Sequence, residues 1–175
     1  MNQMVDEWGV QCLDVRFLPK TIGDSLLISN EAVISKMGNL NNLRLLISNN
    51  PRAGTIRGMH FQDIVSEEWK LVFPVSGSIF DVVVNVDKNS NHFGKLKTYE
   101  LSNVKNKCLL IPPGYAHGYQ TLTSHTTVLY LISGHYSSES AHELNPLDPD
   151  LRIPWPIQSQ TNFDHKENIK YLYEF

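Results

Sequence analysis

Cysteine is scarce in this sequence, and the two that occur lie far apart. Cys12 and Cys108 show no spacing typical of a zinc site. Two distant cysteines cannot form the dense disulfide framework that stabilises small secreted domains. Both thiols are therefore expected to stay reduced, as in a cytoplasmic protein.

Long apolar runs and a large excess of one charge are also missing. The longest apolar stretches have the length of a strand. Residues 1–10 carry acidic and polar side chains where a signal peptide needs a basic flank and an apolar stretch. The 15 lysines and arginines nearly balance the 18 aspartates and glutamates, without a basic stripe. We therefore expect neither a membrane nor a nucleic acid as partner.

Helix signals are few, whereas strand signals fill the middle of the chain. Residues 70–75, 78–87, 108–111 and 126–132 are rich in β-branched and aromatic side chains, and Gly, Pro and Asn residues separate them. This pattern predicts an all-β sandwich or barrel, in one domain that spans residues 1–175. The expected exception is a short C-terminal helix, because Ile169, Leu172 and Tyr173 have amphipathic spacing.

His60 lies in the stretch TIRGMHFQ, residues 55–62, which alternates like a strand. Strict alternation divides this stretch into two faces, with Ile56, Gly58, His60 and Gln62 on one and Arg57, Met59 and Phe61 on the other. The glycine on the histidine face indicates that another group approaches the backbone closely. A catalytic base, a metal ligand and a hydrogen-bonded core histidine are the competing interpretations of His60.

A second histidine, His117, follows the turn at residues 112–114 in IPPGYAHGY. Asp81 lies in the otherwise apolar strand expected over residues 78–87, on the face of Ile79 and Val83. A buried carboxylate needs a partner, because burying it unpaired costs several kcal/mol. We therefore predict an Asp81–His117 pair.

Three further polar residues, Tyr130, Lys70 and Arg57, interrupt apolar strands. Tyr130 is either a site residue or a core aromatic. Buried cations usually pair, so Lys70 and Arg57 are candidates for binding an anionic group such as a phosphate. Their alternative is a solvent-exposed position on an edge strand.

Several motifs occur together in an order typical of one enzyme family. Between residues 54 and 156 they are GTIRGMHFQ, EEWKLV, GSIFDVVVNVD, NSNHFG, LLIPPGYAHGYQTL, VLYLISGHYS and DPDLRIPWP. On these motifs the chain resembles the dTDP-4-dehydrorhamnose 3,5-epimerase family, also called dTDP-6-deoxy-4-keto-glucose 3,5-epimerases. The resemblance implies a jelly-roll (cupin-like) β-sandwich, a homodimer and catalysis without a metal or organic cofactor.

The resemblance also implies roles for individual residues. His60 matches the catalytic base, Tyr130 matches the general acid, and Lys70 matches a lysine that helps to stabilise an enolate. Arg57 matches a substrate-binding arginine, and His117 and Asp81 match the second His of the family and its Asp. We expect His117, Gln62, His135 and Tyr136 to bind substrate as well. The 4-keto group of a nucleotide-linked sugar acidifies the hydrogens on C3 and C5, so a neutral histidine can remove one near neutral pH.

The chain departs from the family pattern in three places. Residues 18–33 lack the usual arginine-glycine-aromatic run, and the Gln and Asn that usually precede the arginine are not evident in RLLISNNPRAG. His135 stands where an aromatic residue often stacks on the base. The carboxylate that orients the catalytic histidine is either Asp164 or Glu167. The nucleotide, the sugar and the number of inverted carbons therefore stay open, including a single-centre 3- or 5-epimerase.

Other members of the same superfold remain as alternatives. PPGYAHG satisfies the second half of a metal-cupin pattern, but the first half needs two histidines one residue apart, and MHFQ offers one. A catalytically silent sugar-nucleotide binder would need neither an acid nor a base. A 3,4-ketoisomerase would not be expected to carry this His and Tyr in this order.

The main interpretation is a metal-free, cytoplasmic, homodimeric epimerase of nucleotide-linked 4-keto-6-deoxy sugars. Its product would feed synthesis of rhamnose or a rarer deoxysugar of a surface polysaccharide.

Overall fold

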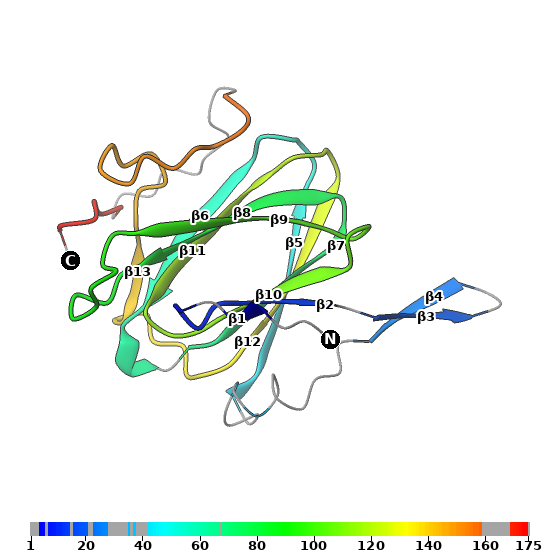
Figure 1. Cartoon of the computed structure of the whole chain (residues 1–175), viewed down its shortest axis with the longest axis horizontal. Coiled ribbons are helices and arrows are strands. Elements are labelled where there is room, and N and C mark those ends of the chain that lie inside the picture. Colours follow the sequence, from blue (N-terminus) through cyan, green and yellow to red (C-terminus); the bar gives the residue numbers. More distant parts are fainter. Residues whose placement is uncertain are drawn as a thin grey trace.

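The computed structural model describes residues 4–5, 7–14, 16–20, 23–27, 35, 37, 42–66, 68–158 and 169–174. Within these ranges the chain forms mainly antiparallel strands, and helix is limited to short pieces such as the 3-10 helix η2 (Ile64–Ser66). Figure 1 shows two sheets that face each other, with a hairpin extending away from them. The all-β prediction is confirmed.

The first sheet has six strands in the order β1-β2-β10-β7-β12-β5. Their bounds are β1 (Met4–Val5), β2 (Gln11–Asp14), β10 (Lys107–Ile111), β7 (Lys70–Ser76), β12 (Thr126–Ile132) and β5 (Arg44–Asn50). All four strands expected from the sequence are present. Three of them, β7, β10 and β12, are neighbours in this sheet.

The second sheet has five strands in the order β13-β6-β11-β8-β9. Their bounds are β13 (Ala141–Glu143), β6 (Ile56–Gln62), β11 (Tyr115–Thr121), β8 (Ser78–Asn85) and β9 (Leu96–Ser102). The separate hairpin consists of β3 (Arg16–Lys20) and β4 (Gly23–Leu27). Both long sheets have every neighbouring pair antiparallel, so adjacent strands need no helical crossover.

The main core lies between the two sheets. Its buried side chains come from both of them, and include Val72, Leu109, Ile111, Val128, Ile79, Val83, Leu101 and Tyr119. A second cluster covers the outer face of the five-stranded sheet, where Leu144, Leu151, Trp155 and Leu172 pack against it. Burying a large apolar side chain contributes about 1.5–3 kcal/mol, so these two clusters fix the positions of the strands that carry the polar residues.

Strand β8 follows the alternation expected from its sequence. Ile79 and Val83 point into the core between the sheets, whereas Val82 and Val84 pack on the outer cluster. Asp81 therefore points inward, and its side chain is fully buried.

Strand β6 does not follow the strict alternation that we predicted. His117 of β11 pairs with His60, but Tyr119 pairs with Arg57, so three steps on β6 oppose two steps on β11. This β-bulge lies at Gly58, whose φ of 104° is unfavourable for a side chain. Arg57 and His60 consequently share one face, while Ile56 and Met59 pack together on the other.

The short C-terminal helix that we predicted over Ile169–Tyr173 is wrong. Lys170 instead forms a parallel bridge with Leu144, and a turn follows at residues 172–173. The Asp148 carboxylate accepts a hydrogen bond from the Leu172 backbone N–H, and Leu172 is buried. The apolar spacing reflects docking of an extended segment onto the outer cluster rather than one face of a helix.

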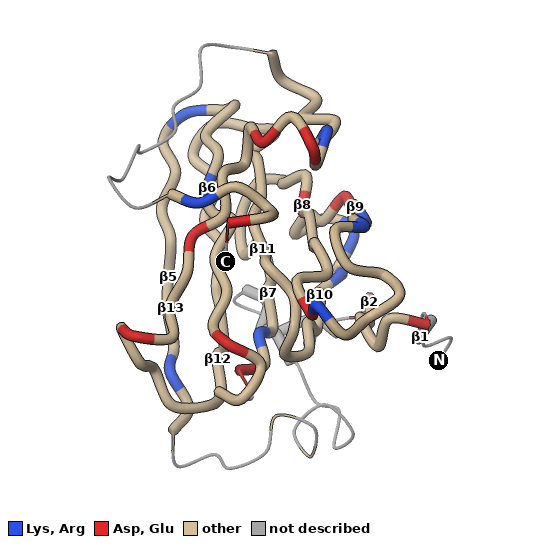
Figure 2. The backbone as a smooth tube through the Cα atoms, turned by 90° about the vertical axis from the view of Figure 1, so that its left-hand side faces the viewer, with Lys and Arg blue, Asp and Glu red and all other residues tan. Residues whose placement is uncertain are grey.

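The surface of the described chain carries both charges. Figure 2 shows Lys and Arg residues interspersed with Asp and Glu along the strands. No helix among the described residues is long and apolar enough to cross a membrane. Cys12 and Cys108 are both free thiols, and burial raises the pKa of Cys108 to about 12, which leaves it unreactive at neutral pH.

Candidate active site

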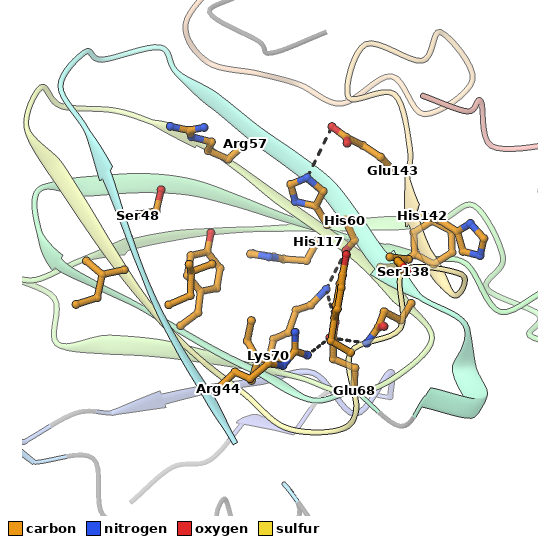
Figure 3. A pocket seen from close by; sticks show the side chains of 18 of the residues that line it. Arg44, Ser48, Arg57, His60, Glu68, Lys70, His117, Ser138, His142 and Glu143 are labelled. Atoms are coloured by element: carbon orange, nitrogen blue, oxygen red, sulfur yellow. Dashed lines mark hydrogen bonds and ion pairs between the residues drawn. The ribbon is translucent and has the colours of Figure 1, made fainter. Parts of the chain in front are cut away.

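A cavity of about 980 Å³ opens between the two sheets on the side of β5, β6 and β13. Five side chains singled out from the sequence line it: His60, Lys70, His117, Tyr130 and Arg57. Figure 3 shows how four of these groups, His60, Lys70, His117 and Arg57, gather around one space. His60, Arg57 and His117 belong to the five-stranded sheet, and Lys70 and Tyr130 to the six-stranded sheet.

His60 lies at the open wall of the cavity, with its side chain about half exposed (51%). Its Nε2 lies 3.7 Å from Oε1 of Glu143, which stands directly opposite it on β13. The backbone carbonyl of His60 accepts a hydrogen bond of 2.9 Å from Nζ of Lys70. His60 thus combines access to solvent and ligand with a nearby carboxylate, as a base requires.

Lys70 is almost buried and belongs to an ion cluster centred on Glu68. Its Nζ lies 3.2 Å from Oε1 of Glu68, while Arg44 donates to Oε2 at 2.6 Å. Gln62 donates its Nε2 to the same Oε2 at 2.7 Å. Burial lowers the pKa of Lys70, the neighbouring Glu68 raises it, and Arg44 lowers it, with a net lowering.

The Asp81–His117 pair predicted from the sequence is confirmed. His117 Nε2 lies 2.8 Å from Oδ2 of Asp81, and both side chains are buried. Burial raises the pKa of Asp81, and the neighbouring His117 lowers it only in part. His117 therefore lies at the back of the cavity with its ring held in place from behind.

Tyr130 lies beside this pair and is partly buried. Its ring centroid is 6.0 Å from that of His117 and 6.3 Å from that of Tyr119. Burial and the adjacent Tyr119 hydroxyl raise the pKa of Tyr130 well above its ordinary value. The hydroxyl therefore keeps its proton across the physiological range and is suited to donate it.

Arg57 is held by side chains of the opposite sheet. Its Nε donates to Oδ1 of Asn50 at 3.2 Å. The amide nitrogen of Asn50 donates to the hydroxyl of Tyr119 at 3.1 Å, and that hydroxyl donates to Ser48 at 3.0 Å. This chain of hydrogen bonds fixes the guanidinium of Arg57 at the cavity wall, where its positive charge suits an anionic group.

Comparison with known proteins agrees with this arrangement. The family model described as dTDP-4-dehydrorhamnose 3,5-epimerase matches residues 28–170. The chain belongs to this epimerase family. The expected jelly-roll fold follows from the same comparison and from the solved structures below.

Curated and solved members of the family resemble the chain over different lengths. The dTDP-4-dehydrorhamnose 3,5-epimerase of Mycobacterium tuberculosis is 36% identical over 105 residues, which are 60% of this chain and 52% of the relative. The chain thus spans about half the length of the curated relatives it matches. The crystal structure of the 3,5-epimerase of Bacillus anthracis, with TDP and pyrophosphate bound, has a TM-score of 0.79 and 31% identity, and covers 91% of this chain and 93% of its own.

A second solved structure is a 3'-monoepimerase. It comes from Streptomyces bikiniensis in complex with dTDP-quinovose, with a TM-score of 0.81 and 28% identity. The match covers 94% of this chain and 84% of the other. The chain is therefore similar both to epimerases named for two centres and to one named for a single centre.

The remaining predicted residues of this epimerase-family chain fall into three groups. Gln62 and Tyr136 line the cavity with the five side chains above. The His135 side chain is exposed and is not among the cavity-lining groups; only its carbonyl is engaged, by Gln62 Nε2 at 3.2 Å. Asp164 and Glu167 lie outside the described residues.

Three cavity residues were not identified as site residues from the sequence, namely Glu143, Glu68 and Arg44, and neither was Asn50, which binds Arg57. Glu143 reaches His60 because β13 pairs with β6, and the short stretch AHE carries no strong strand signal. Glu68 sits two residues before Lys70, and that spacing alone was a usable sign of an ion pair.

The structure also bears on the metal-cupin alternative. Among the described residues no group of three or more His, Cys, Asp and Glu side chains is arranged to hold a metal ion. His60 and His117 stand opposite each other on neighbouring strands, with Asp81 bonded to His117. These two histidines alone are fewer than the three protein ligands of a catalytic zinc or iron site.

Proposed function

We propose that the protein is an epimerase that inverts C3, C5 or both in a nucleotide-linked 4-keto-6-deoxy sugar, without a metal or organic cofactor. The observation that carries the proposal is the cavity between the sheets, which brings His60 from one sheet together with Lys70 and Tyr130 from the other. Epimerisation needs a base and an acid on opposite faces of the sugar ring, and a positive group near the enolate oxygen.

In this mechanism His60 removes the proton next to the ketone. The negative charge moves onto the C4 oxygen as the enolate forms, and the ammonium of Lys70 stabilises it. Tyr130 then donates its proton to the carbon from the opposite face, which inverts that centre. The proton taken by His60 passes to solvent, with which its half-exposed ring is in contact, and the Tyr130 phenolate takes up one proton from solvent, which returns both groups to their starting states.

A carboxylate next to His60 would stabilise the imidazolium after proton removal. Asp164 and Glu167 remain candidates for this role, and Glu143 at 3.7 Å is a further one. His117, with Asp81 behind it, is proposed to contact the substrate between base and acid. Gln62, His135 and Tyr136 are proposed to contact it at the edge of the cavity.

The substrate is proposed to be a thymidine-diphosphate sugar, most simply dTDP-4-keto-6-deoxyglucose. Two of the relatives above are described with TDP or a dTDP sugar bound. Arg57 and Arg44 give the cavity the positive charge that a diphosphate needs. One or two inverted centres are both compatible with the relatives, which include epimerases of each kind.

We further propose that residues 1–175 act as one domain in a cytoplasmic homodimer. The product would supply deoxysugar synthesis, such as that of rhamnose for a surface polysaccharide. The apolar side chains exposed on the edge strand β5 support a partner subunit there.

The decisive experiment is proton NMR of dTDP-4-keto-6-deoxyglucose with the enzyme in heavy water. Loss of both the C3 and C5 proton signals is expected for a 3,5-epimerase, and loss of one signal for a single-centre enzyme. His60→Ala should abolish exchange. Tyr130→Phe should slow inversion by about 10²–10⁴-fold but retain part of the exchange, because the base is still present.

Two results would contradict the proposal. If the folded wild-type protein exchanges no proton of this sugar or of the corresponding uridine and guanosine sugars, the chain is a silent binder. Complete loss of exchange in Tyr130→Phe would show that the roles of His60 and Tyr130 are divided wrongly.

A further inference from the structure

The Glu68 carboxylate is the centre of the best-connected ion cluster in the cavity, and no role has been given to it so far. It is nearly buried, with 9% of its side chain exposed. Its Oε1 faces Lys70 at 3.2 Å, and its Oε2 accepts hydrogen bonds from Arg44 at 2.6 Å and Gln62 at 2.7 Å. One side chain thus connects strands β5, β6 and β7. The dashed lines in Figure 3 mark its ion pairs with Arg44 and Lys70.

We infer that Glu68 is a positioning residue that keeps Lys70 charged and fixed at the cavity and joins it to the loop that carries Tyr136. This inference rests on the proposed function, because it assigns the charge of Lys70 to the stabilisation of an enolate. Both carboxylate oxygens of Glu68 are already engaged by its three partners, so its assigned role is positioning rather than contact with the reacting atoms.

The charge balance of the cluster explains the first part of this role. Lys70 and Arg44 are two cations that share a single carboxylate. Without Glu68, Lys70 would lie in a nearly dry site next to an uncompensated guanidinium, and both effects favour the neutral amine. Burial and Arg44 already lower the pKa of Lys70, and Glu68 is the group that opposes them. A neutral amine would supply no positive charge to an enolate.

The hydrogen bonds beyond Glu68 explain the second part. Gln62, which donates to Glu68, also donates to the His135 carbonyl and accepts from the Ser137 backbone N–H at 2.9 Å. Arg44 places its guanidinium 5.3 Å from the centre of the Tyr136 ring. The same carboxylate therefore holds both contacts that position residues 135–137 at the edge of the cavity.

Other titratable or charged groups also face this part of the cavity. Those described are Arg44 on β5, Arg57 and His60 on β6, Tyr130 on β12, His117 on β11 with Asp81 behind it, His142 and Glu143 on β13, and Tyr136, Glu139 and Lys170 outside the named strands. Tyr130 has a raised pKa and Lys70 a lowered one. As the pH rises, Lys70 is thus expected to lose its proton before Tyr130, and the fall of kcat at alkaline pH should report on Lys70.

The first test is a titration of Lys70 by carbon NMR in protein labelled with ¹³C-lysine, with its signal assigned from Lys70→Arg. In Glu68→Gln the midpoint should fall by about one to three pH units, because an opposite charge within hydrogen-bond distance is removed. In Arg44→Gln the titration midpoint of Lys70 should rise, because Lys70 is then the only cation paired with Glu68 in this cluster. Glu100→Gln is the matched control. Glu100 lies on β9 and forms an exposed ion pair with Lys105, so its removal should leave the titration midpoint of Lys70 unchanged.

The second test is the pH dependence of epimerisation. In Glu68→Gln the alkaline fall of kcat should move to lower pH by the shift measured for Lys70, and KM should rise because residues 135–137 lose their support. Glu100→Gln should keep the wild-type profile. An unchanged Lys70 midpoint in folded Glu68→Gln overturns the inference, and so does an unchanged alkaline fall in an active enzyme.

These outcomes separate the inference from the proposed function. A shifted Lys70 midpoint in a protein that acts on no keto sugar would support the Glu68–Lys70 relation and reject the epimerase. Should Glu68→Gln not fold, Arg44→Gln decides: an upward shift supports the inference, and an unchanged midpoint overturns it.

Discussion

At the scale of single residues, the buried Asp81–His117 pair has the largest expected effect on stability. His117→Ala would leave the Asp81 carboxylate in the core without its partner. We expect a loss of about 3–5 kcal/mol in the free energy of unfolding near neutral pH, measured by urea denaturation. His142→Ala is the matched control, because it breaks a pair of 2.9 Å whose Asp63 is exposed, and it should cost about 0–1 kcal/mol.

The same variant has a pH dependence of known sign. Burial raises the pKa of Asp81, and removal of His117 removes the main group that lowers it. The folded variant thus binds a proton more readily than the unfolded chain, and this contribution to stability is lost as the pH rises through the folded-state pKa. The loss in free energy of unfolding caused by His117→Ala should be smaller at about pH 5 than at about pH 8. A loss that grows towards acid pH would show that another group compensates the charge of the Asp81 carboxylate.

At the scale of elements, the bulge in β6 is what turns Arg57 and His60 to the same side. A methyl group at Gly58 would lie 2.5 Å from the carbonyl oxygen of His117, at a φ of 104°. Gly58→Ala should therefore combine backbone strain of about 1–3 kcal/mol with a clash between β6 and β11. We expect lower stability and lost proton exchange together, measured by thermal unfolding and by NMR in heavy water.

Gly9→Ala separates strain from clash. Gly9 also has a positive φ, of 77°, but its methyl would meet nothing closer than Pro112 at 3.8 Å. The stability of this variant should fall only by the backbone strain that the methyl group introduces, and the variant should retain proton exchange. Equal losses in both variants would mean that the close approach of β6 and β11 has no effect of its own.

The strands could be predicted from the sequence where packing and local propensity agree. Strand β12 has the bounds expected from its apolar run, because it pairs with a regular strand on each edge. Strand β8 has the expected alternation, because both of its faces are buried. The faces of β6 could not be predicted, because a bulge depends on the partner strand and a glycine alone does not specify it. The prediction of a C-terminal helix was wrong for a related reason, since the apolar residues of that segment dock on a surface formed by distant parts of the chain.

The candidate site was predictable only where a motif carried it. His60, Lys70, His117 and Tyr130 were named from the sequence, and the structure gathers them around one cavity. Glu143 was missed because its proximity to His60 arises from the pairing of two strands that are far apart in the chain. The roles of all these residues stay predictions until the exchange experiment is made.

At the scale of the whole molecule, the outer edge of the six-stranded sheet predicts an interface between two copies. Leu45 and Ile47 alternate on the edge strand β5 and are 63% and 55% exposed. Exposed apolar side chains on an unpaired edge favour association. The wild-type protein should sediment as a dimer, and Leu45→Lys with Ile47→Lys should shift it towards the monomer in analytical ultracentrifugation.

The control for this prediction is Val104→Lys. Val104 is 83% exposed and lies between β9 and β10, away from that edge, so the added charge should leave the dimer intact. A monomeric wild type, or a dimer insensitive to both lysines on β5, would contradict the proposed interface.

The division of the proposed acid and base between two sheets has a consequence for core residues that never touch a ligand. His60 stands on one layer, Tyr130 and Lys70 on the other, and layers of a sandwich lie about 10 Å apart because of the side chains between them. The distance between the two sheets is therefore set by core side chains such as Val72, Val83 and Tyr119. That distance limits the size of the sugar that fits between His60 and Tyr130. Tolerance for bulkier sugars would then be altered by resizing the interior of the protein, with every group that meets the sugar left in place.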